Sequence, residues 1–218
     1  MSKDKQDDKQ ENLGALEQLL LLNSQGSGAP SPELRLISLY GEVDEERAAE
    51  IAYTLLVLKE TGISFIIPED ADPETEPTQV CEPIKFMIST YGGTAADMFS
   101  IYDVMRMIRD ECEIHTFALG KVMSAGVLLL AAGTKGERLI GKHCRIMLHG
   151  VVGGSHGAIH NLENEMDEIR WLQEQHTKCL VEETNLTKRE LKRMLNRKVN
   201  VYLTAEEAVK FGIADRIV

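Results

Sequence analysis

The sequence predicts an α/β domain built from repeated βαβ units. Three observations indicate this fold class: short apolar runs alternate with longer segments whose apolar residues recur every three or four positions, the turns between them are short, and 43% of the 218 residues are hydrophobic, enough for one substantial core. Units of this kind join parallel strands by right-handed crossovers. The ends of several strands are therefore expected to meet at one edge of the sheet.

The domain is expected to begin with a strand and a helix. Residues 34–40 alternate enough between apolar and polar side chains to form a strand, and Asp44 is a suitable N-cap for a helix over residues 46–59. The apolar face of this helix consists of Ala48, Ile51, Leu55 and Leu58. The helix should end at Thr61-Gly62.

Strands and helices then alternate from residue 84 onward. The sequence predicts strands over residues 84–89, 114–119 and 145–149 and helices over residues 95–109 and 125–132. A glycine-rich, extended segment over residues 151–157 leads to a long helix from about Ile159 to Glu183. The apolar face of the long helix consists of Leu162, Met166, Ile169, Leu172 and Leu180. At roughly 1.5 Å per residue, this helix should extend beyond the sheet.

Two segments differ in character from this compact domain, which is expected to span residues 34–218. Residues 1–33 form an N-terminal extension that is expected to be disordered or to contain one short helix, with a linker of Gly, Ser and Pro before the domain. The acidic, Pro-containing segment 68–82 has no basic residue and is expected to be an exposed loop. Its role is open between a docking surface and a plain solvated loop.

The composition argues against several classes of function. A net charge of −11 disfavours binding to nucleic acid or to an anionic membrane, because phosphate-binding surfaces depend on clustered Lys and Arg. No apolar run has signal-peptide or membrane-spanning length, so a cytoplasmic location is expected. The four cysteines have neither zinc-site spacing nor the density of a disulfide scaffold, and they are expected to be reduced packing residues. They are Cys81, Cys112, Cys144 and Cys179.

The segment from Gly120 to Gly133 carries the most specific functional signal. It places Ser124 between glycines at the head of an apolar run. A helix beginning just after Ser124 would direct its free backbone amides at an oxyanion forming there. A serine hydroxyl also needs a base that removes its proton, and His149, at the end of a strand, is the candidate. His156 and His160 follow in a flexible or helical region and are expected to be solvated.

Several motifs in this order resemble the ClpP family of serine peptidases, the proteolytic ring components of the Clp machines. Besides the serine segment, they are the stretch from Ile88 to Thr94 with its Gly-Gly turn, Ser100-Ile101-Tyr102-Asp103, the run at 131–138 and the closing stretch from Leu203 to Gly212. The resemblance covers about residues 34–218. It implies a crotonase-like spiral of βαβ units with a projecting handle, one strand and one helix, at about residues 150–184.

The resemblance also implies an assembly. Members of the family form heptameric rings stacked into a tetradecamer, here homomeric or mixed, that degrades unfolded polypeptides in protein quality control. A Clp-type ATPase would deliver these substrates. The segment from Gly150 to Gly154 lacks the Lys-Ser/Thr ending of a nucleotide-binding loop, so only the partner would use ATP. No cofactor or metal ion is expected in this chain.

Carried over position by position, the resemblance implies a serine peptidase site. Ser124, His149 and Asn200 occupy the positions of the catalytic triad, and the backbone amides of Gly93 and Ala125 occupy those of the oxyanion hole. The positions expected to contact the substrate are Gly92, Gly150, Val151 and Val152. A glycine-rich strand edge beside the histidine could pair with an extended peptide.

The chain departs from the family pattern around this site. Tyr91 stands where a proline normally precedes the glycines, Ala125 where a methionine follows the serine, and Gly150-Val151 where Gln-Pro follows the histidine. Asn200 replaces the aspartate that orients the histidine. Its amide oxygen can accept a hydrogen bond from Nδ1, but it has no charge to stabilise the imidazolium. The sequence therefore leaves two functions open: a serine endopeptidase of reduced rate, or an inactive ring subunit of the ClpR type that modulates an active ClpP.

Overall fold

The computed structural model describes residues 34–67, 76–195 and 199–218. Residues Arg35–Val218 form one compact unit, and Met1–Leu34 form another, of which only Leu34 is described. The expectation of a disordered or short-helical extension over residues 1–33 therefore lies outside the described residues. No helix in the described part of the chain combines the length and apolar character needed to cross a membrane.

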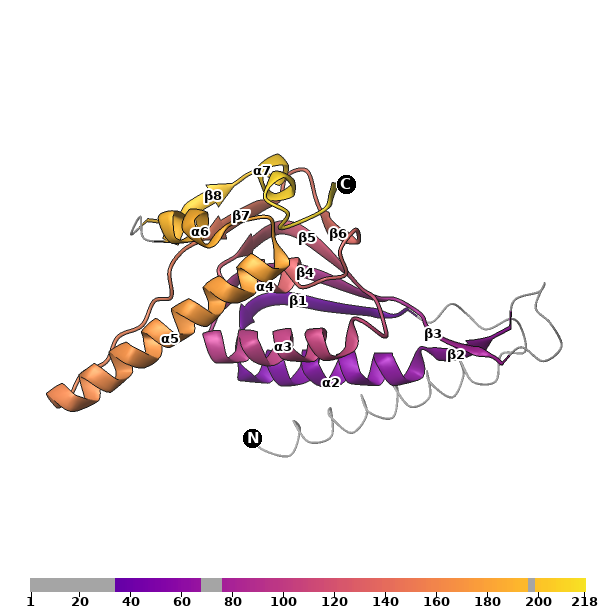
Figure 1. The fold of residues 1–218 in the computed structure, drawn as a ribbon, viewed down its shortest axis with the longest axis horizontal. Helices are drawn as coiled ribbons and strands as arrows, with labels where there is room; N and C mark the ends of the chain where they lie inside the picture. The colour runs from indigo at the N-terminus through magenta and orange to yellow at the C-terminus, as the bar shows by residue number, and fades with distance from the viewer. Residues whose placement is uncertain (1–33, 68–75, 196–198) are drawn as a thin grey trace, which may run out of the picture. The chain divides into compact units, whose positions relative to one another are not determined.

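A mainly parallel sheet forms the centre of the unit (Figure 1). Its strands in the described chain are β1 (Leu36–Val43), β4 (Ile84–Gly93), β5 (Ile114–Met123), β6 (Arg138–Ile140), β7 (Arg145–Leu148), β8 (Val201–Leu203) and β9 (Arg216–Ile217). The main path runs β1-β4-β5-β6-β9, while β7 pairs with β5 and β8. Within this sheet, as far as the chain is described, only β7 and β8 pair antiparallel. The predicted α/β fold class is confirmed.

Helices connect and cover these strands. They are α2 (Glu45–Thr61), α3 (Ala95–Ile108), α4 (Ala125–Ala131), α5 (Ile159–Glu183), α6 (Lys188–Leu195) and α7 (Ala205–Lys210). In Figure 1, α2 and α3 lie side by side along the sheet, and α4 packs against β4 and β5. Every residue of α4 is buried, because its sequence is apolar in all directions and it has no solvent-facing side.

The caps of the first helices follow from local sequence. Asp44 caps α2, where its carboxylate accepts a hydrogen bond from the Arg47 amide at 2.9 Å, as predicted. Thr94 caps α3 in the same way, and its hydroxyl accepts from the Asp97 amide at 3.2 Å. These bonds satisfy amides that have no partner inside the helix, so the helix starts lie where the sequence places them.

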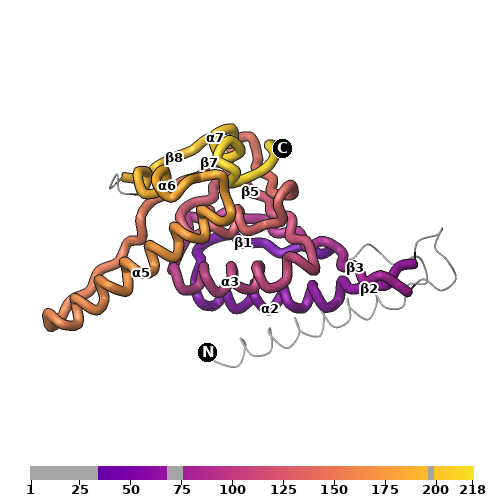
Figure 2. Tube along the Cα trace, viewed as in Figure 1, coloured from indigo at the N-terminus to yellow at the C-terminus, as the bar shows by residue number. Residues whose placement is uncertain are grey.

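The long helix α5 has two different parts. Its C-terminal turns are buried at His176, Thr177, Leu180 and Glu183, whereas most side chains of the earlier turns are exposed, and this part extends away from the sheet (Figure 2). The predicted helix over about 159–183 is therefore confirmed. The expected handle strand is absent from residues 150–158, which have no strand partner in the described chain. An extended backbone becomes a strand only when another strand pairs with it.

Two expectations about the segment after α2 were wrong. Part of the predicted acidic loop is a strand: β3 (Thr78–Cys81) pairs antiparallel with β2 (Ile63–Ile66) to form a two-stranded ribbon. Cys81, at the end of this ribbon, forms a disulfide with Cys112, so these two cysteines are not reduced. Chain spacing could not reveal the pairing, because folding brings residues 31 positions apart to a Cα separation of 5.0 Å. Cys144 and Cys179 are free.

Candidate active site

A cavity of about 880 Å³ opens where the strands of the main sheet end. Its walls come from the β1 end, the turn after β4, the start of α4, the segment after β7 and the middle of α5. The lining includes every predicted site residue except Asn200: Gly92, Gly93, Ser124, Ala125, His149, Gly150, Val151 and Val152. The fold thus collects residues from separate stretches of sequence around one space.

Ser124 lies on the sharp turn between β5 and α4. Its φ of 52° and ψ of −120° make it the one non-glycine residue with positive φ in the described chain. Its amide donates to the Met147 carbonyl at 2.8 Å, which fixes the turn against β7. Such strained turns recur at active sites, because they expose a side chain that a relaxed backbone would bury. The predicted helix start at Ala125 is confirmed, and its amide has no partner inside α4.

The Gly-Gly turn touches the backbone around Ser124. Gly92 has φ of 104°, and a Cβ on it would stand 2.6 Å from the Ser124 Cβ. A Cβ on Gly93 would stand 1.9 Å from the Val43 carbonyl oxygen. Both positions therefore require glycine for space, and only then can the β4 end lie against the serine turn.

The side chain of Thr90 fixes the Gly-Gly turn by hydrogen bonds, a role that was not predicted from the sequence. Its hydroxyl accepts from the Gly92 amide at 2.9 Å and donates to the Gly41 carbonyl. Its side chain is fully buried. The available signal was a threonine two residues before a glycine pair, where a hydroxyl can bond the local backbone.

His149 follows β7 directly and shares an edge of the sheet with Ser124. The parallel pairing of Met123 with Met147 places the two residues at the ends of neighbouring strands. The imidazole Nδ1 lies 2.6 Å from the Gly150 carbonyl oxygen. A carbonyl only accepts hydrogen bonds, so Nδ1 carries the proton in this contact and the neutral ring keeps Nε2 free as a base.

Asn200 lies close in register to His149 but is not bonded to it. The antiparallel pairing of Leu148 with Val201 places Asn200 across from His149, one residue beyond the paired strands. Asn200 is exposed, and no hydrogen bond joins it to the imidazole within the described residues. In this structure the Gly150 carbonyl occupies the Nδ1 side of the ring.

The segment after His149 is held by α5. The Val151 amide donates to Oε1 of Gln173 at 2.7 Å, while Val152 is 82% exposed. Gln173 was not singled out in the sequence. The sequence held one indication of its position: Gln173 stands three residues before His176 on the predicted helix, so the two side chains were expected to share a face of that helix.

His176 is the second residue of α5 that the sequence analysis missed. It is 5% exposed and lines the cavity, and its Nε2 has no hydrogen-bond partner among the described residues. Burial, helped by the nearby His149, lowers the pKa of His176 to about 4. The cavity wall therefore presents a neutral imidazole at neutral pH.

The remaining predictions about histidines concern the approach to α5. His156 and His160 are both exposed, as expected, and His160 lies 3.5 Å from Glu163.

Within residues 34–67, 76–195 and 199–218 no three His, Cys, Asp or Glu side chains gather in a group that could hold a metal ion. The polar side chains that line the cavity include the hydroxyl of Ser124, the imidazoles of His149 and His176 and the carboxylates of Glu42 and Glu165.

Comparison with known proteins gives two findings. The model of the Clp protease family matches residues 75–218. The chain is also 33% identical, over 183 residues, to proteins named ATP-dependent Clp protease proteolytic subunit 1 from Prochlorococcus marinus strain MIT 9312 and from Prochlorococcus marinus subsp. pastoris. Each alignment covers 84% of this chain and 83% of the relative.

Proposed function

Because the chain belongs to the Clp protease family, we propose that it is a serine endopeptidase that uses Ser124 as its nucleophile and His149 as its base. One observation carries the proposal: Ser124, on a strained turn, and His149 leave adjacent parallel strands and line the same cavity. This geometry suits a hydroxyl and an imidazole that must act together. The wide cavity suits an extended peptide.

The proposed reaction follows from these groups. His149 Nε2 takes the Ser124 proton as Oγ attacks the peptide carbonyl carbon, and the backbone amides of Gly93 and Ala125 stabilise the resulting oxyanion. The imidazolium then gives its proton to the leaving amine, which departs as the acyl-enzyme forms. Water, deprotonated by His149, attacks the acyl-enzyme, and Oγ regains its proton when the acid product leaves.

Two acceptors can orient His149 in this scheme. The Gly150 carbonyl lies within hydrogen-bond distance of Nδ1, and Asn200 is the third triad member implied by the family pattern. Either one selects the tautomer with a free Nε2, but neither carries the negative charge that stabilises an imidazolium. The proposed enzyme is therefore slower than one with an aspartate at position 200.

The proposed assembly is a pair of stacked heptameric rings, homomeric or mixed. A Clp-type ATPase would use ATP to deliver unfolded polypeptides, in keeping with the words ATP-dependent in the names of the relatives. The exposed half of α5 supports ring contacts, because it presents Ile159 and Trp171 to solvent. We place this activity in the cytoplasm, in protein quality control, with neither nucleic acid nor membrane as a partner.

A second candidate function is an inactive ring subunit that modulates an active ClpP. The exposed Asn200, with no bond to His149 in the described residues, favours this alternative. The fold and the ring contacts would then be used without chemistry at Ser124.

A fluorophosphonate probe separates the two functions. Assembled, full-length protein is treated with the probe, and the labelled residue is found by peptide mass spectrometry, with S124A as the control. Labelling of Ser124 together with turnover of a fluorogenic peptide is the expected result. A native mass that corresponds to a complete ring, with no label and no turnover, would establish the inactive subunit instead.

A further inference from the structure

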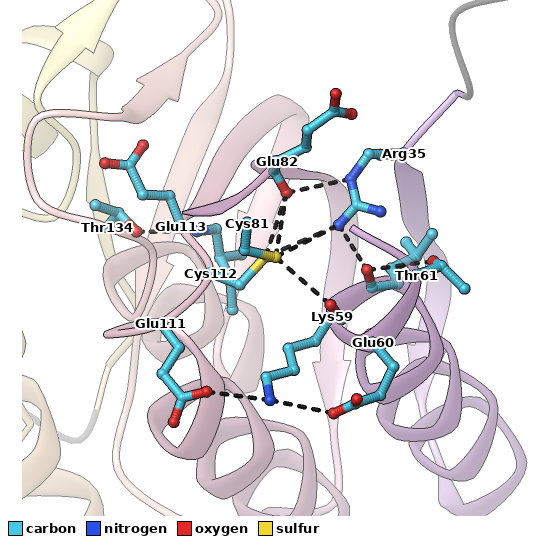
Figure 3. The surroundings of a disulfide bond; sticks show 12 residues. Arg35, Lys59, Glu60, Thr61, Cys81, Glu82, Glu111, Cys112, Glu113 and Thr134 are labelled. Atoms are coloured by element: carbon cyan, nitrogen blue, oxygen red, sulfur yellow. Dashed lines mark hydrogen bonds and ion pairs between the residues drawn. A yellow bond between two sulfur atoms is a disulfide. The ribbon is translucent and has the colours of Figure 1, made fainter. Parts of the chain in front are cut away.

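The disulfide between Cys81 and Cys112 lies beside a buried positive charge (Figure 3). Arg35 is 6% exposed, and its Nη2 is 4.0 Å from the Cys81 sulfur and 3.8 Å from the Cys112 sulfur. The other contacts of the guanidinium are carbonyl oxygens: Nη2 donates to Leu58 at 2.6 Å, and Nε donates to Glu82 at 3.1 Å.

Among the described residues, the guanidinium has no anionic partner. In the described chain no carboxylate lies within ion-pair distance of Arg35, and its Nη1 has no hydrogen bond. The guanidinium nevertheless fits closely in its place, because residue 62 is a glycine: a Cβ on Gly62 would stand 2.2 Å from Nη2. Burying a charge without a counterion is costly, so another state of the site should supply one.

Reduction of the disulfide supplies that anion. A guanidinium next to a cysteine favours the thiolate over the thiol, which makes the sulfur both a better nucleophile and a better leaving group. Among the described residues, the groups in contact with Arg35 that can become negative in this way are the sulfurs of Cys81 and Cys112. We propose that Cys81 and Cys112 form a reversible disulfide that exchanges with low-molecular-weight disulfides and thiols, with Arg35 stabilising the reduced thiolate.

Exposure assigns the order of the exchange. Cys81 is partly exposed, whereas Cys112 is 1% exposed. On oxidation, the Cys81 thiolate attacks a low-molecular-weight disulfide and releases one thiolate. The Cys112 thiolate then attacks the Cys81 sulfur and expels the second one. The two protons of the protein thiols pass to the released thiols, and the small disulfide is reduced as the protein pair is oxidised. In reduction, an external thiolate attacks Cys81, and Cys112 leaves beside Arg35.

The bond controls how firmly the β2–β3 ribbon is attached. It joins the last residue of β3 to the turn between α3 and β5. Most of the ribbon residues are exposed, and a two-stranded ribbon with little buried surface is marginally stable alone. Opening the disulfide therefore loosens the ribbon and leaves the main sheet intact.

Two measurements on the full-length protein test the proposal without any peptidase assay. The protein is equilibrated with mixtures of reduced and oxidised glutathione, and free thiols are blocked before peptide mass spectrometry under non-reducing conditions. The linked peptide of Cys81 and Cys112 is expected to appear and disappear across the series. Hydrogen exchange of residues 63–66 and 78–81 should be about tenfold faster in the reduced form. C81S should exchange at the fast rate in every mixture.

The role of Arg35 is tested on the reduced protein. Alkylation of Cys81 by iodoacetamide, measured relative to the free Cys179 of the same molecule, should be about tenfold slower in R35Q and near the wild-type rate in R35K. An unchanged ratio in folded R35Q would remove Arg35 from the proposal. The glutathione series decides the exchange itself without any substitution. A pair that stays fully linked, or fully unlinked, in every mixture overturns it.

Discussion

Gly92 lies so close to Ser124 that no side chain fits between them, since a Cβ at position 92 would come within 2.6 Å of the Ser124 Cβ. Real side chains almost never approach this closely, so one of the two backbones would have to move. The Gly-Gly turn and the serine turn are therefore one rigid unit, although they stand at the ends of different strands, β4 and β5.

Replacing Gly92 by Ala is expected to lower both stability and peptidase turnover, by more than the strain of its backbone conformation alone would cause. Its positive φ costs an alanine about 1–2 kcal/mol of stability, and the clash with Ser124 adds to that. We expect peptidase turnover to fall about 100-fold, because small displacements of a nucleophile have effects of this size. Urea unfolding and fluorogenic peptide turnover measure the two effects.

Gly136 provides the matched control for this substitution. It has φ of 96°, but a Cβ on it would meet nothing within 4 Å. G136A should therefore lose similar stability from backbone strain and keep its turnover. Equal turnover in G92A and G136A would contradict the close packing of Gly92 on Ser124.

Substitution of Asn200 by Asp is expected to raise the peptidase rate. A carboxylate opposite His149 would stabilise the imidazolium, which an amide cannot do. We expect a gain of about 10-fold or more, but less than the roughly 10⁴-fold effect of the reverse change in chymotrypsin-like enzymes, because that effect comes from the wrong tautomer. In N200A, the Gly150 carbonyl should preserve the tautomer, so the loss should stay below about 10-fold. Steady-state kinetics compare the three proteins. An N200D variant no faster than the wild type would argue against position 200 as the orienting residue.

Acid is expected to destabilise the protein through His176. An unfolded histidine has a pKa of about 6.5, and burial lowers that of His176 to about 4, so the folded state binds fewer protons. Above about pH 6.5 His176 is neutral in both states, so its ionisation does not change the free energy of unfolding. As the pH falls from 6.5 toward 4, the unfolded state gains the proton first, and the free energy of unfolding decreases, by roughly 2 kcal/mol at pH 5. Urea unfolding at pH 7 and pH 5 measures this loss.

Two variants isolate the part that belongs to His176. H176M should be about 1 kcal/mol more stable than the wild type at pH 7, because it removes a buried nitrogen that has no partner among the described residues, and it should lose less stability in acid. H160M should follow the wild type, because His160 is exposed near the start of α5. A wild-type pH dependence in H176M would show that other groups cause it.

The attachment of α5 should depend on one buried carboxylate. The Glu183 side chain is fully buried and accepts hydrogen bonds from Tyr102 at 3.0 Å, Arg106 at 3.0 Å and Arg109 at 2.8 Å. Burial alone would raise the pKa of Glu183, but these bonds outweigh it and hold that pKa below its usual value. R109M should cost about 3 kcal/mol of stability, because the buried carboxylate of Glu183 then loses the less exposed of its two arginine partners.

R106M is the matched control, because Arg106 lies in the last turn of α3, just before the C-cap residue Arg109, and has the same carboxylate partner. The Arg106 side chain is 45% exposed, against 13% for Arg109, so water replaces much of its interaction and the loss should stay within about 1 kcal/mol. Thermal or urea unfolding of both variants compares them. Equal losses would mean that exposure does not decide the strength of these pairs.

Local sequence predicted the elements well where the signals lie within a few residues of each other. Asp44 capped α2 and α4 began at Ala125 as expected, because capping and apolar periodicity depend on neighbours along the chain. The ribbon strand β3 was missed, because its short polar sequence becomes a strand only by pairing with β2. Pairing also explains why residues 150–158, at the start of the expected handle, form no strand: no strand of the described chain pairs with them.

The candidate site divides in the same way. The sequence pointed to Ser124, His149 and the glycine pair because each stands at the end of a recognisable strand, and parallel strands bring their ends together. It did not reveal Thr90 or His176, whose roles depend on contacts with distant backbone or on burial inside the cavity wall.

By itself, then, the amino-acid order determined the α/β class, the approximate starts of α2, α3, α4 and α5, and the candidates for nucleophile and base, because these properties arise from side-chain chemistry and short-range periodicity. Only the tertiary structure decided that Cys81 meets Cys112 beside Arg35, that the Gly150 carbonyl contacts His149, and that His176 is buried without a partner among the described residues. Contacts of this kind join residues that are far apart in the chain or set by local backbone geometry, and no pattern of spacing encodes their distances.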